Sequence, residues 1–555
     1  MERLEKREWL ALSALLLVAG ILLSYLPFSG VTTFLSPDET GVFVAAKNWA
    51  EQGSVVIDEK LAPVIPWLHP RSWVSNGTTI VPVGFLGWPW IISWFIRIFG
   101  PMSASIGAML VILSCIYPLY RLMRPIGKVP AFIGTIVAVT SPAFLLYGNR
   151  SLFPNAAIVA LALWSGWMFR DMIVNLAPSK AEGTSRISPL ALLGRKEVKQ
   201  RIILVFFGIL SGLMLAIRPV EAVWIIPWFI VLGWNWRPTL KSSLWIVLGL
   251  FIALTPLAWE AQVAYGGFWK AGYWMKGNSA ITTSAPIPQN VYSPELFPFG
   301  IHPRYIASNA YSFLAMTLFP WMVPLLIMFA LVTIGIVKDE SQKNWQARLK
   351  KFVSGVRGKY FLAALWTFLF LVLYYGNGRY LDNINGNATV GNSYIRYLLP
   401  LGFLSGLSLA WIYRLSTISK YGRPVVLAIA VILSLTGIWR AYGADEEGLL
   451  AGRAEVRRYA SVRESVAQWF KAGDIILSER SDKIFFPNYR AVSPLPSIEE
   501  SARLIAADNE GYAIGLYVRP MTQAQADIWR KVGLEPIEIT SFGREKLYRL
   551  QPVKP

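Results

Sequence analysis

Cysteine and histidine are almost absent from this sequence of 555 residues, which holds one cysteine, Cys115, and two histidines, His69 and His302. A single cysteine forms no disulfide within the chain, and Cys115 lies in an apolar run. So few thiols and imidazoles argue against a dedicated zinc site, which takes several Cys or His ligands. We therefore expect no His/Cys metal centre.

Charged residues are also scarce, at 15% of the chain, whereas apolar residues make up 54% and tryptophan alone contributes 24 residues. This balance is too apolar for a soluble enzyme of such length and predicts a polytopic membrane protein. Runs such as "WLALSALLLVAGILLSYL" and "FLAALWTFLFLVLYY" can cross a hydrocarbon core of about 30 Å as helices. The net charge of +20 is spread among these runs, so we expect membrane lipids and no nucleic acid as partners.

Several short catalytic motifs are missing too. The chain has no Walker-type loop, no HExxH and no GxSxG sequence. The glycines of "YYGNGRY" are too few to indicate a dinucleotide site. The topology and the polar residues of the loops are therefore the features that can indicate the function.

Basic residues predict the orientation, because they keep to the cytoplasmic side of short loops. Placing the basic clusters inside gives a cytoplasmic N-terminus, an external C-terminus and about eleven transmembrane helices. The expected spans are residues 9–28, 103–120, 129–147, 155–170, 202–217, 220–235, 243–260, 309–337, 360–376, 395–413 and 424–440.

Residues 84–99, "GFLGWPWIISWFIRIF", are apolar but do not fit this topology. A span at this place would put the cluster around Arg121 on the wrong side of the membrane. The segment contains Pro89, three tryptophans and Arg97, which favours an interfacial or re-entrant helix at the outer leaflet. An ordinary span with weak charge bias around it is the alternative.

The topology predicts a transmembrane catalytic domain at residues 1–440 and an external soluble domain at residues 441–555. The first carries an external loop over 29–102, with interfacial helices, and a second large loop over 261–308. The tail combines amphipathic helical patterns with strand-like runs such as "YAIGLYV", which is typical of a small α/β domain. The expected fold class is thus mostly α, a membrane helical bundle with a small external α/β domain.

Two adjacent acids, Asp38 and Glu39, follow Ser36 and Pro37 just outside the first expected span. Acids at this place can stabilise the first turn of an interfacial helix, because the N-terminal end of the helix dipole favours negative charge. A carboxylate partly shielded from water at the membrane surface can also act as a general base. The two interpretations are compatible.

Arginines stand in the external loops and at the external ends of several spans. Any one of them can be an anchor that snorkels to the membrane surface. Several that converge would form an anionic site, because a planar guanidinium binds phosphate through two hydrogen bonds. A membrane enzyme that holds a lipid phosphate needs such a site. The arginines concerned include Arg71, Arg150, Arg218, Arg304 and Arg396.

These pieces together resemble the GT-C fold glycosyltransferases, and among them the protein O-mannosyltransferases and the lipid A aminoarabinose transferases. The resemblance rests on "SPDE" after the first span, the Pro/Gly-rich "VPVGFLGWP…RIFG", "LAIRPVEAVWIIPW", "YIRYLLP" and the external C-terminal domain. It covers most of residues 1–440 in architecture. It implies an inner-membrane glycosyltransferase that takes a sugar from a polyprenyl-phosphate donor on the external, periplasmic face and passes it to a protein, lipid or glycan acceptor.

The resemblance also implies roles for residues. The family's acid pair matches Asp38 and Glu39, which are therefore the expected catalytic residues. Asp38 would be the base that deprotonates the acceptor hydroxyl, giving inversion, and Glu39 would cap the helix or orient the acceptor. Arg396 resembles the arginine near the donor phosphate. On this basis the expected donor phosphate-binding residues are Arg396, Arg304, Arg218, Arg71 and Arg150, and the expected substrate-binding residues are His69, His302, Tyr397 and Tyr305.

The chain departs from the family at "YGNRSLFPN", where many members have another acid and this chain has Arg150 and Asn155. This difference argues against a divalent metal bound by carboxylates, so we expect a metal-independent mechanism and no cofactor. The C-terminal domain matches no family signature.

Two other functions remain open at this stage. An O-antigen ligase or polymerase type of enzyme, which uses polyprenyl diphosphate donors, would have His302 and Arg304 at its core and would not need Asp38. A lipid or solute transporter would line a pathway with the arginines. The sequence shows no internal repeat and few charges in mid-span, which weighs against the transporter.

Overall fold

The computed structural model describes residues 4–176, 189–234, 239–275, 300–337, 344–380, 388–416, 421–444 and 447–553. The chain divides into two compact units. The helical unit comprises residues 1–27, 108–255 and 290–451, and the sheet unit comprises residues 28–107, 256–289 and 452–555. The middle of the expected loop over 261–308 lies outside the described residues.

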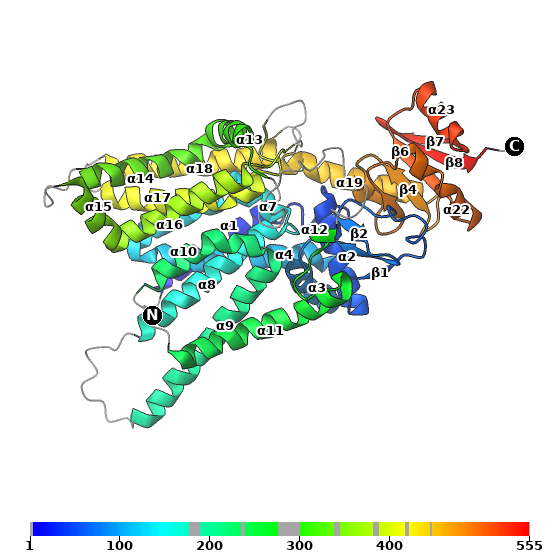
Figure 1. The fold of residues 1–555 in the computed structure, drawn as a ribbon. Coiled ribbons are helices and arrows are strands. Elements are labelled where there is room, and N and C mark those ends of the chain that lie inside the picture. The colour runs from blue at the N-terminus through cyan, green and yellow to red at the C-terminus, as the bar shows by residue number, and fades with distance from the viewer. Residues whose placement is uncertain are drawn as a thin grey trace. The chain divides into compact units, whose positions relative to one another are not determined.

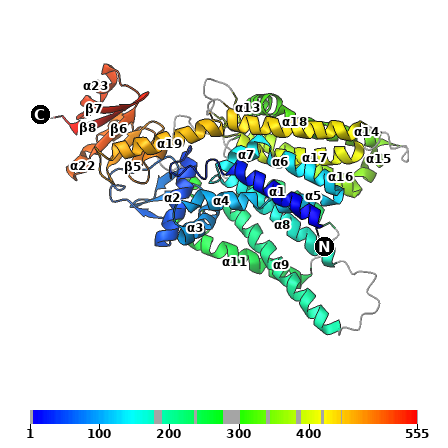
Figure 2. The same cartoon turned by 180° about the vertical axis from the view of Figure 1, so that it is seen from behind.

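The helical unit is built from long apolar helices joined by short turns and 3₁₀ or π segments (Figure 1). Seen from behind, the N-terminal helix α1 lies against α6 and α7 (Figure 2). The elements are α1 (Lys6–Leu23), α4 (Ser103–Leu113), α5 (Ile116–Met123), η1 (Arg124–Ile126), α6 (Lys128–Val139), α7 (Pro142–Asn149), α8 (Pro154–Leu176), α9 (Pro189–Ile217), η2 (Pro219–Glu221), α10 (Ala222–Leu232), α11 (Leu240–Tyr265), α13 (Pro303–Asn309), η4 (Ala310–Thr317), α14 (Phe319–Val337), α15 (Trp345–Ser354), α16 (Val356–Phe370), η5 (Leu371–Tyr375), η7 (Ile395–Leu398), α17 (Leu399–Leu415) and α18 (Gly422–Gly443).

Seven helices in the described part of the chain are long and apolar enough to cross a membrane, or eight if the bent pair α6 and α7 is one span. The two helices of this pair meet at 58°, where Ser141 and Pro142 interrupt the helix expected over 129–147. Proline lacks the N–H that a continuous helix requires. The predicted multispan helical bundle is confirmed, and the number of eleven spans stays a prediction.

Glycines allow two central helices of this unit, α6 and α17, to pack backbone to backbone. A Cβ on Gly134 would lie 2.6 Å from the carbonyl oxygen of Gly406, and a Cβ on Gly406 would lie 2.2 Å from that of Gly134. Close approach at small residues is a common way for membrane helices to associate, because lipid offers no hydrophobic drive between them.

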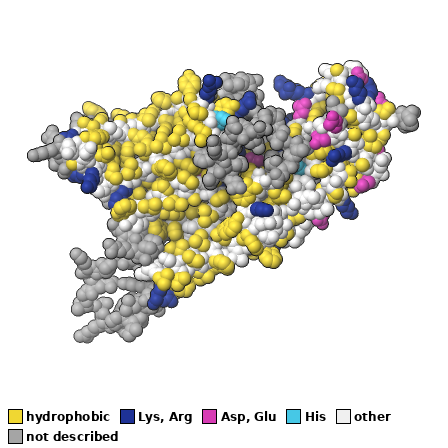
Figure 3. Space-filling model, viewed as in Figure 1, with side chains coloured by type: hydrophobic (Ala, Val, Ile, Leu, Met, Phe, Trp, Pro, Cys, Tyr) yellow, Lys and Arg dark blue, Asp and Glu magenta, His cyan; other side chains and the backbone are white. Residues whose placement is uncertain are grey.

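Apolar side chains cover the outside of the helical unit, as Figure 3 shows over α11, α14 and α16. On α11, Leu244 and Phe251 are exposed, and on α18 so are Ile432 and Leu435. Soluble proteins rarely expose contiguous apolar surface on this scale. The chain is therefore a multi-pass membrane protein.

The sheet unit contains every strand found in the described residues. Its helices include α3, which has 13 residues and is therefore about 20 Å long, too short to span the bilayer. An interfacial place for this helix, expected from residues 84–99, stays a prediction. The elements are α2 (Pro37–Gln52), β1 (Ile57–Asp58), β2 (Trp73–Ser75), β3 (Thr79–Pro82), α3 (Gly87–Phe99), α12 (Gly272–Met275), α19 (Leu449–Val466), β4 (Ile475–Ser478), α20 (Asp482–Phe485), β5 (Arg490–Val492), α21 (Ile498–Ser501), α22 (Leu504–Asn509), β6 (Ile514–Val518), α23 (Gln523–Lys531), β7 (Leu534–Phe542) and β8 (Glu545–Pro552).

Two sheets form in this unit. The smaller one is antiparallel, with strand order β1-β3-β2. The larger one has the order β5-β4-β6-β8-β7, in which β4 runs parallel to β5 and β6, while β8 runs antiparallel to β6 and β7. The register pairs Leu477 with Leu516 and Tyr517 with Leu547. The α/β tail expected from the sequence is confirmed.

Residues of the segment 29–102, which the sequence predicts to be the first external loop, share one hydrophobic core with the C-terminal sheet. Leu61, Ile65 and Trp67 from the loop pack with Ile475 and Leu516 from the sheet, and all five are nearly inaccessible. Burial of this apolar surface is the main force that joins the two segments. The predicted boundary at residue 440 concerns the placement relative to a membrane and stays a prediction.

Candidate functional site

Three of the expected phosphate-binding arginines come together in the helical unit. We call the group the arginine cluster. It consists of Arg150, Phe153, Arg218, Glu221, Tyr375, Arg396 and Tyr397.

Arg218 follows the last residue of α9 and precedes Pro219, so its backbone is extended (φ −159°, ψ 92°) and the chain turns there. Its Nε lies 3.1 Å from Oε1 of Glu221, and its Nη2 donates to the Tyr375 hydroxyl at 3.3 Å. The guanidinium also lies 4.9 Å from the centre of the Tyr397 ring. These contacts hold Arg218 in one orientation.

Arg396 lies in η7, just before α17. Its guanidinium is 4.8 Å from the Phe153 ring and 5.1 Å from the Tyr397 ring, and its Nη2 donates to the Tyr397 hydroxyl at 3.2 Å. Arg150, buried at the end of α7, lies 4.8 Å from the same Phe153 ring. Three guanidinium groups therefore surround two aromatic rings, and such a gathering of like charge suits an anion as ligand.

Glu221 and Tyr375 also belong to the cluster, although the sequence did not predict them as site residues. The buried Glu221 carboxylate accepts hydrogen bonds from the Tyr375 hydroxyl at 2.6 Å and from the Trp224 indole at 2.5 Å, besides its ion pair with Arg218. Tyr375 in turn stacks on Tyr397, with 4.2 Å between ring centres. The spacing of Arg218 and Glu221, one helical turn apart in "RPVE", was the available signal.

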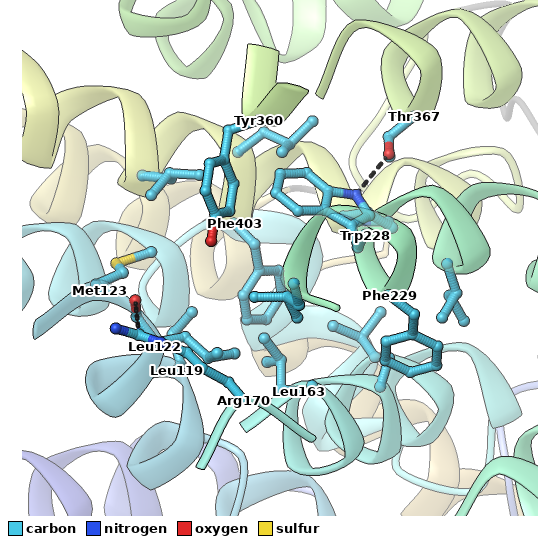
Figure 4. Close-up of a pocket in the computed structure, with 18 of the residues that line it drawn as sticks. Leu119, Leu122, Met123, Leu163, Arg170, Trp228, Phe229, Tyr360, Thr367 and Phe403 are labelled. Atoms are coloured by element: carbon cyan, nitrogen blue, oxygen red, sulfur yellow. Dashed lines mark hydrogen bonds between the residues drawn. The ribbon is translucent and has the colours of Figure 1, made fainter. Parts of the chain in front are cut away.

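Trp224, whose indole donates to Glu221 of the cluster, also lines an apolar cavity of about 300 Å³ in the helical unit. Figure 4 shows its lining, with Leu119, Met123 and Leu163 among the apolar side chains that point into it. Two polar side chains at its wall have hydrogen-bond partners: the Trp228 indole donates to the Thr367 hydroxyl at 2.9 Å, and Arg170 donates to the Leu122 carbonyl at 3.1 Å. A hydrocarbon chain is the kind of ligand that such a lining accommodates.

His302, Arg304 and Tyr305, at the start of α13, are placed differently. The His302 backbone N–H donates to the Asn377 side-chain oxygen at 2.5 Å, and the His302 ring lies 5.1 Å from the Tyr305 ring. Arg304 and Tyr305 are exposed. Their described contacts do not include the arginine cluster.

The acid pair lies in the sheet unit, at the first turn of α2. Ser36 is the N-cap, and its hydroxyl accepts a hydrogen bond from the Asp38 backbone N–H at 3.1 Å. The Asp38 side chain is exposed, and its Oδ1 accepts from the Ser72 hydroxyl at 3.1 Å. Glu39 is only 4% exposed. The cap at Ser36 and the acids in the first turn are as predicted, whereas the interfacial place of the helix stays a prediction. The exposed acid is the one assigned as the base.

Arg71 and His69, also in the sheet unit, have local contacts. The Arg71 side chain forms an ion pair of 2.6 Å with Asp482, whose side chain is fully buried. His69 is half-buried, with Nδ1 3.2 Å from the Pro70 carbonyl oxygen. Their roles in donor or substrate binding stay predictions.

The described residues contain no group of three or more His, Cys, Asp or Glu side chains placed to hold a metal ion. Metal independence therefore stays an expectation that rests on the sequence.

Comparison with known proteins adds information on the fold. No family model matches the chain, and no curated protein matches it. Two solved structures of ArnT from Cupriavidus metallidurans resemble it over nearly their full length. The one bound to undecaprenyl phosphate has a TM-score of 0.50 and 13% identity, covering 98% of each chain. The apo state has a TM-score of 0.52 and 12% identity, covering 97% of each chain. The chain thus has the GT-C fold of ArnT, a lipid A aminoarabinose transferase, as expected from the sequence.

Proposed function

We propose that this chain is an integral-membrane glycosyltransferase that transfers a sugar, with inversion, from a polyprenyl-phosphate donor to a protein, lipid or glycan acceptor. The observation that carries the proposal is the convergence of Arg150, Arg218 and Arg396, joined through Trp224 to an apolar cavity. A phosphate on a hydrocarbon chain has the matching chemistry. ArnT, which shares the fold, has been solved with undecaprenyl phosphate bound.

The arginine cluster would stabilise the negative charge on the leaving phosphate. The phosphodiester of a polyprenyl-phosphate sugar carries one negative charge, and the phosphate released from it carries up to two. Preorganised guanidinium groups therefore interact more strongly with the transition state than with the bound donor, which is the condition for accelerating the reaction. The aromatic rings and Glu221 hold the guanidiniums in place before the donor binds.

Asp38 would be the general base. Its carboxylate takes the proton of the acceptor hydroxyl while that oxygen attacks the anomeric carbon, and the bond between that carbon and the phosphate oxygen breaks with its electrons leaving on the phosphate. A single displacement of this kind inverts the anomeric centre. The exposed place of Asp38, with Ser72 donating to Oδ1, is consistent with access by an acceptor. Glu39, buried next to it, would stabilise the first turn of α2 or orient the acceptor.

The apolar cavity would hold isoprene units of the donor. Each buried methylene contributes about 0.8 kcal/mol, so a few units give substantial affinity without any polar contact. We further propose an inner-membrane location, with the N-terminus in the cytoplasm, chemistry on the external face and no metal requirement.

The test is donor turnover by the full chain in lipid nanodiscs. The donors are undecaprenyl-phosphate sugars with radiolabelled glucose, mannose, galactose or 4-amino-4-deoxyarabinose, and membrane extract supplies acceptors. We expect the loss of a general base in Asp38→Asn to lower kcat by about 100-fold or more. Glu39→Gln shows whether the second acid is also required, and His302→Ala tests the alternative ligase type of enzyme, in which His302 belongs to the core.

Two results would contradict the proposal. Full turnover by Asp38→Asn combined with loss in His302→Ala would favour the ligase type of enzyme, in which His302 and Arg304 form the core. Donor consumption that persists unchanged in an Arg218→Gln, Arg396→Gln double variant would show that the arginine cluster does not act on the donor.

A further inference from the structure

The segment that carries Asp38 is held by the C-terminal part of the sheet unit. The Lys483 ammonium, on α20, donates to the Leu35 carbonyl oxygen at 2.6 Å. The Thr33 hydroxyl donates to the Val456 carbonyl oxygen on α19, also at 2.6 Å. Leu35 immediately precedes Ser36, the N-cap of α2, so these contacts fix where the helix begins.

A second set of contacts reaches the Asp38 side chain itself. Asp482, the neighbour of Lys483, accepts three hydrogen bonds from Arg71: from N at 2.9 Å, from Nε at 3.0 Å and from Nη2 at 2.6 Å. The residue after Arg71 is Ser72, whose hydroxyl donates to Oδ1 of Asp38. A shift of the Arg71 backbone therefore moves the donor that orients the carboxylate, because consecutive Cα atoms are only about 3.8 Å apart.

The first set of contacts fixes α2 and the second fixes Ser72, and α2 and Ser72 pack tightly against each other. A Cβ on Gly41 would lie 2.9 Å from the Ser72 Cβ, so a glycine is needed one turn after Asp38 for this approach. The Ser72 backbone is fixed as well, since its carbonyl accepts from the Val83 N–H at 2.9 Å. Small displacements of Ser72 are thus transmitted to Asp38.

We infer that Asp482 and Lys483 are positioning residues for the transfer reaction, through which the C-terminal domain sets the orientation of Asp38. The inference rests on the proposed function, in which Asp38 is the base. It assigns a catalytic purpose to a domain that matches no known signature. Both residues follow β4 at the carboxyl end of a parallel strand, the edge of an open α/β sheet where functional residues gather.

A matched control exists in the same unit. Glu59, 6% exposed, forms an ion pair of 2.9 Å with Arg490, so it also links the first external loop to the C-terminal sheet. None of the contacts described for this pair involves residues 33–38. Glu59→Gln therefore tests only the loss of an ion pair between this loop and the C-terminal sheet, whereas Asp482→Asn also disturbs the orientation of Asp38.

The experiment compares kcat, donor KM and melting temperature for full-length variants, with the labelled donors above. Misplacement of a reacting group by about 1 Å costs about 100-fold, so we expect Asp482→Asn to lower kcat by about 10- to 100-fold with donor KM unchanged. Lys483→Met should lower kcat in the same way, and Lys483→Arg, which keeps a donor for Leu35, should restore most of it. Glu59→Gln should lower the melting temperature but leave kcat within about threefold of wild type, because the geometry at Asp38 is kept.

Ser72→Ala removes the hydroxyl without touching the buried pair, and it tests the same idea if Asp482→Asn fails to fold. Wild-type kcat in folded Asp482→Asn, or in Ser72→Ala, would overturn the inference while an inactive Asp38→Asn left the proposed function intact. Equal losses of kcat in Asp482→Asn and Glu59→Gln would also overturn it, since the effect would then follow linkage in general. Full activity of Asp38→Asn would instead refute the role of the base.

Discussion

Replacing Arg396 by glutamine tests whether the arginine cluster binds a phosphate. Arg396 offers its guanidinium between two rings, at 4.8 Å from Phe153 and 5.1 Å from Tyr397. Glutamine keeps a polar side chain but removes the charge and the paired donors. A hydrogen bond to a charged group contributes about 1.5–3 kcal/mol, which corresponds to a loss of affinity of about 10- to 150-fold. Arg396→Lys keeps the charge without the planar fork, so its loss should be smaller.

The assay is equilibrium binding of radiolabelled undecaprenyl phosphate to the full chain in nanodiscs of zwitterionic lipid. Undecaprenol, which has the same chain without the phosphate, serves as the second ligand. Arg396→Gln should weaken undecaprenyl phosphate and leave undecaprenol unchanged. The control variant is Arg414→Gln, because Arg414 donates to the carbonyls of Pro125 and Ile126 at 3.1 and 3.0 Å and lies outside the cluster. Equal losses for both ligands, or for both variants, would refute the reasoning.

Two further predictions concern the structure around the site. Gly406→Ala places a Cβ 2.2 Å from a backbone oxygen of α6, and overpacking of this kind should destabilise the helical unit by about 1–3 kcal/mol. The control is Gly335→Ala, where a Cβ meets nothing within 4 Å, and thermal unfolding in detergent compares the two; equal melting temperatures would contradict the packing argument. Trp224→Phe keeps the cavity wall but removes a hydrogen bond to the buried Glu221, at a cost of about 1–3 kcal/mol. Unchanged unfolding of that variant would mean that the indole does not support the cluster.

The fold class could be predicted because the membrane constrains it so strongly. Long apolar runs must form helices in lipid, because a helix satisfies its own backbone hydrogen bonds there. The alternating pattern of the tail predicts the strands of a small sheet. The number of spans was harder to predict, because hydropathy does not show where a helix bends. Residues 129–147 read as one run, yet they form α6 and α7 at an angle of 58°. Nor did anything in the sequence indicate that residues 29–102 share one core with the C-terminal sheet, since Trp67 and Ile475 are far apart in the chain.

The candidate site was predicted where single residues were conspicuous and missed where partners were needed. Arg150, Arg218 and Arg396 stood out as cations at the ends of apolar runs, and the structure brings them together. Glu221 and Tyr375 are ordinary members of their segments, and only the fold shows that they hold Arg218. Asp482, in the tail, was likewise invisible as the partner of Arg71.

The arginines of the cluster stand on the side of the membrane that the sequence predicts to be external. Basic residues on that side would run against the charge bias that orients membrane proteins, so each would need a compensating interaction. Glu221 pairs with Arg218, and the Phe153 and Tyr397 rings are among the groups that contact Arg396. Aromatic faces stabilise a guanidinium by only about 0.5–2 kcal/mol and do not neutralise its charge. Three guanidinium groups share the Phe153 and Tyr397 rings, and this convergence is the feature that favours the proposed phosphate binding over three separate anchors.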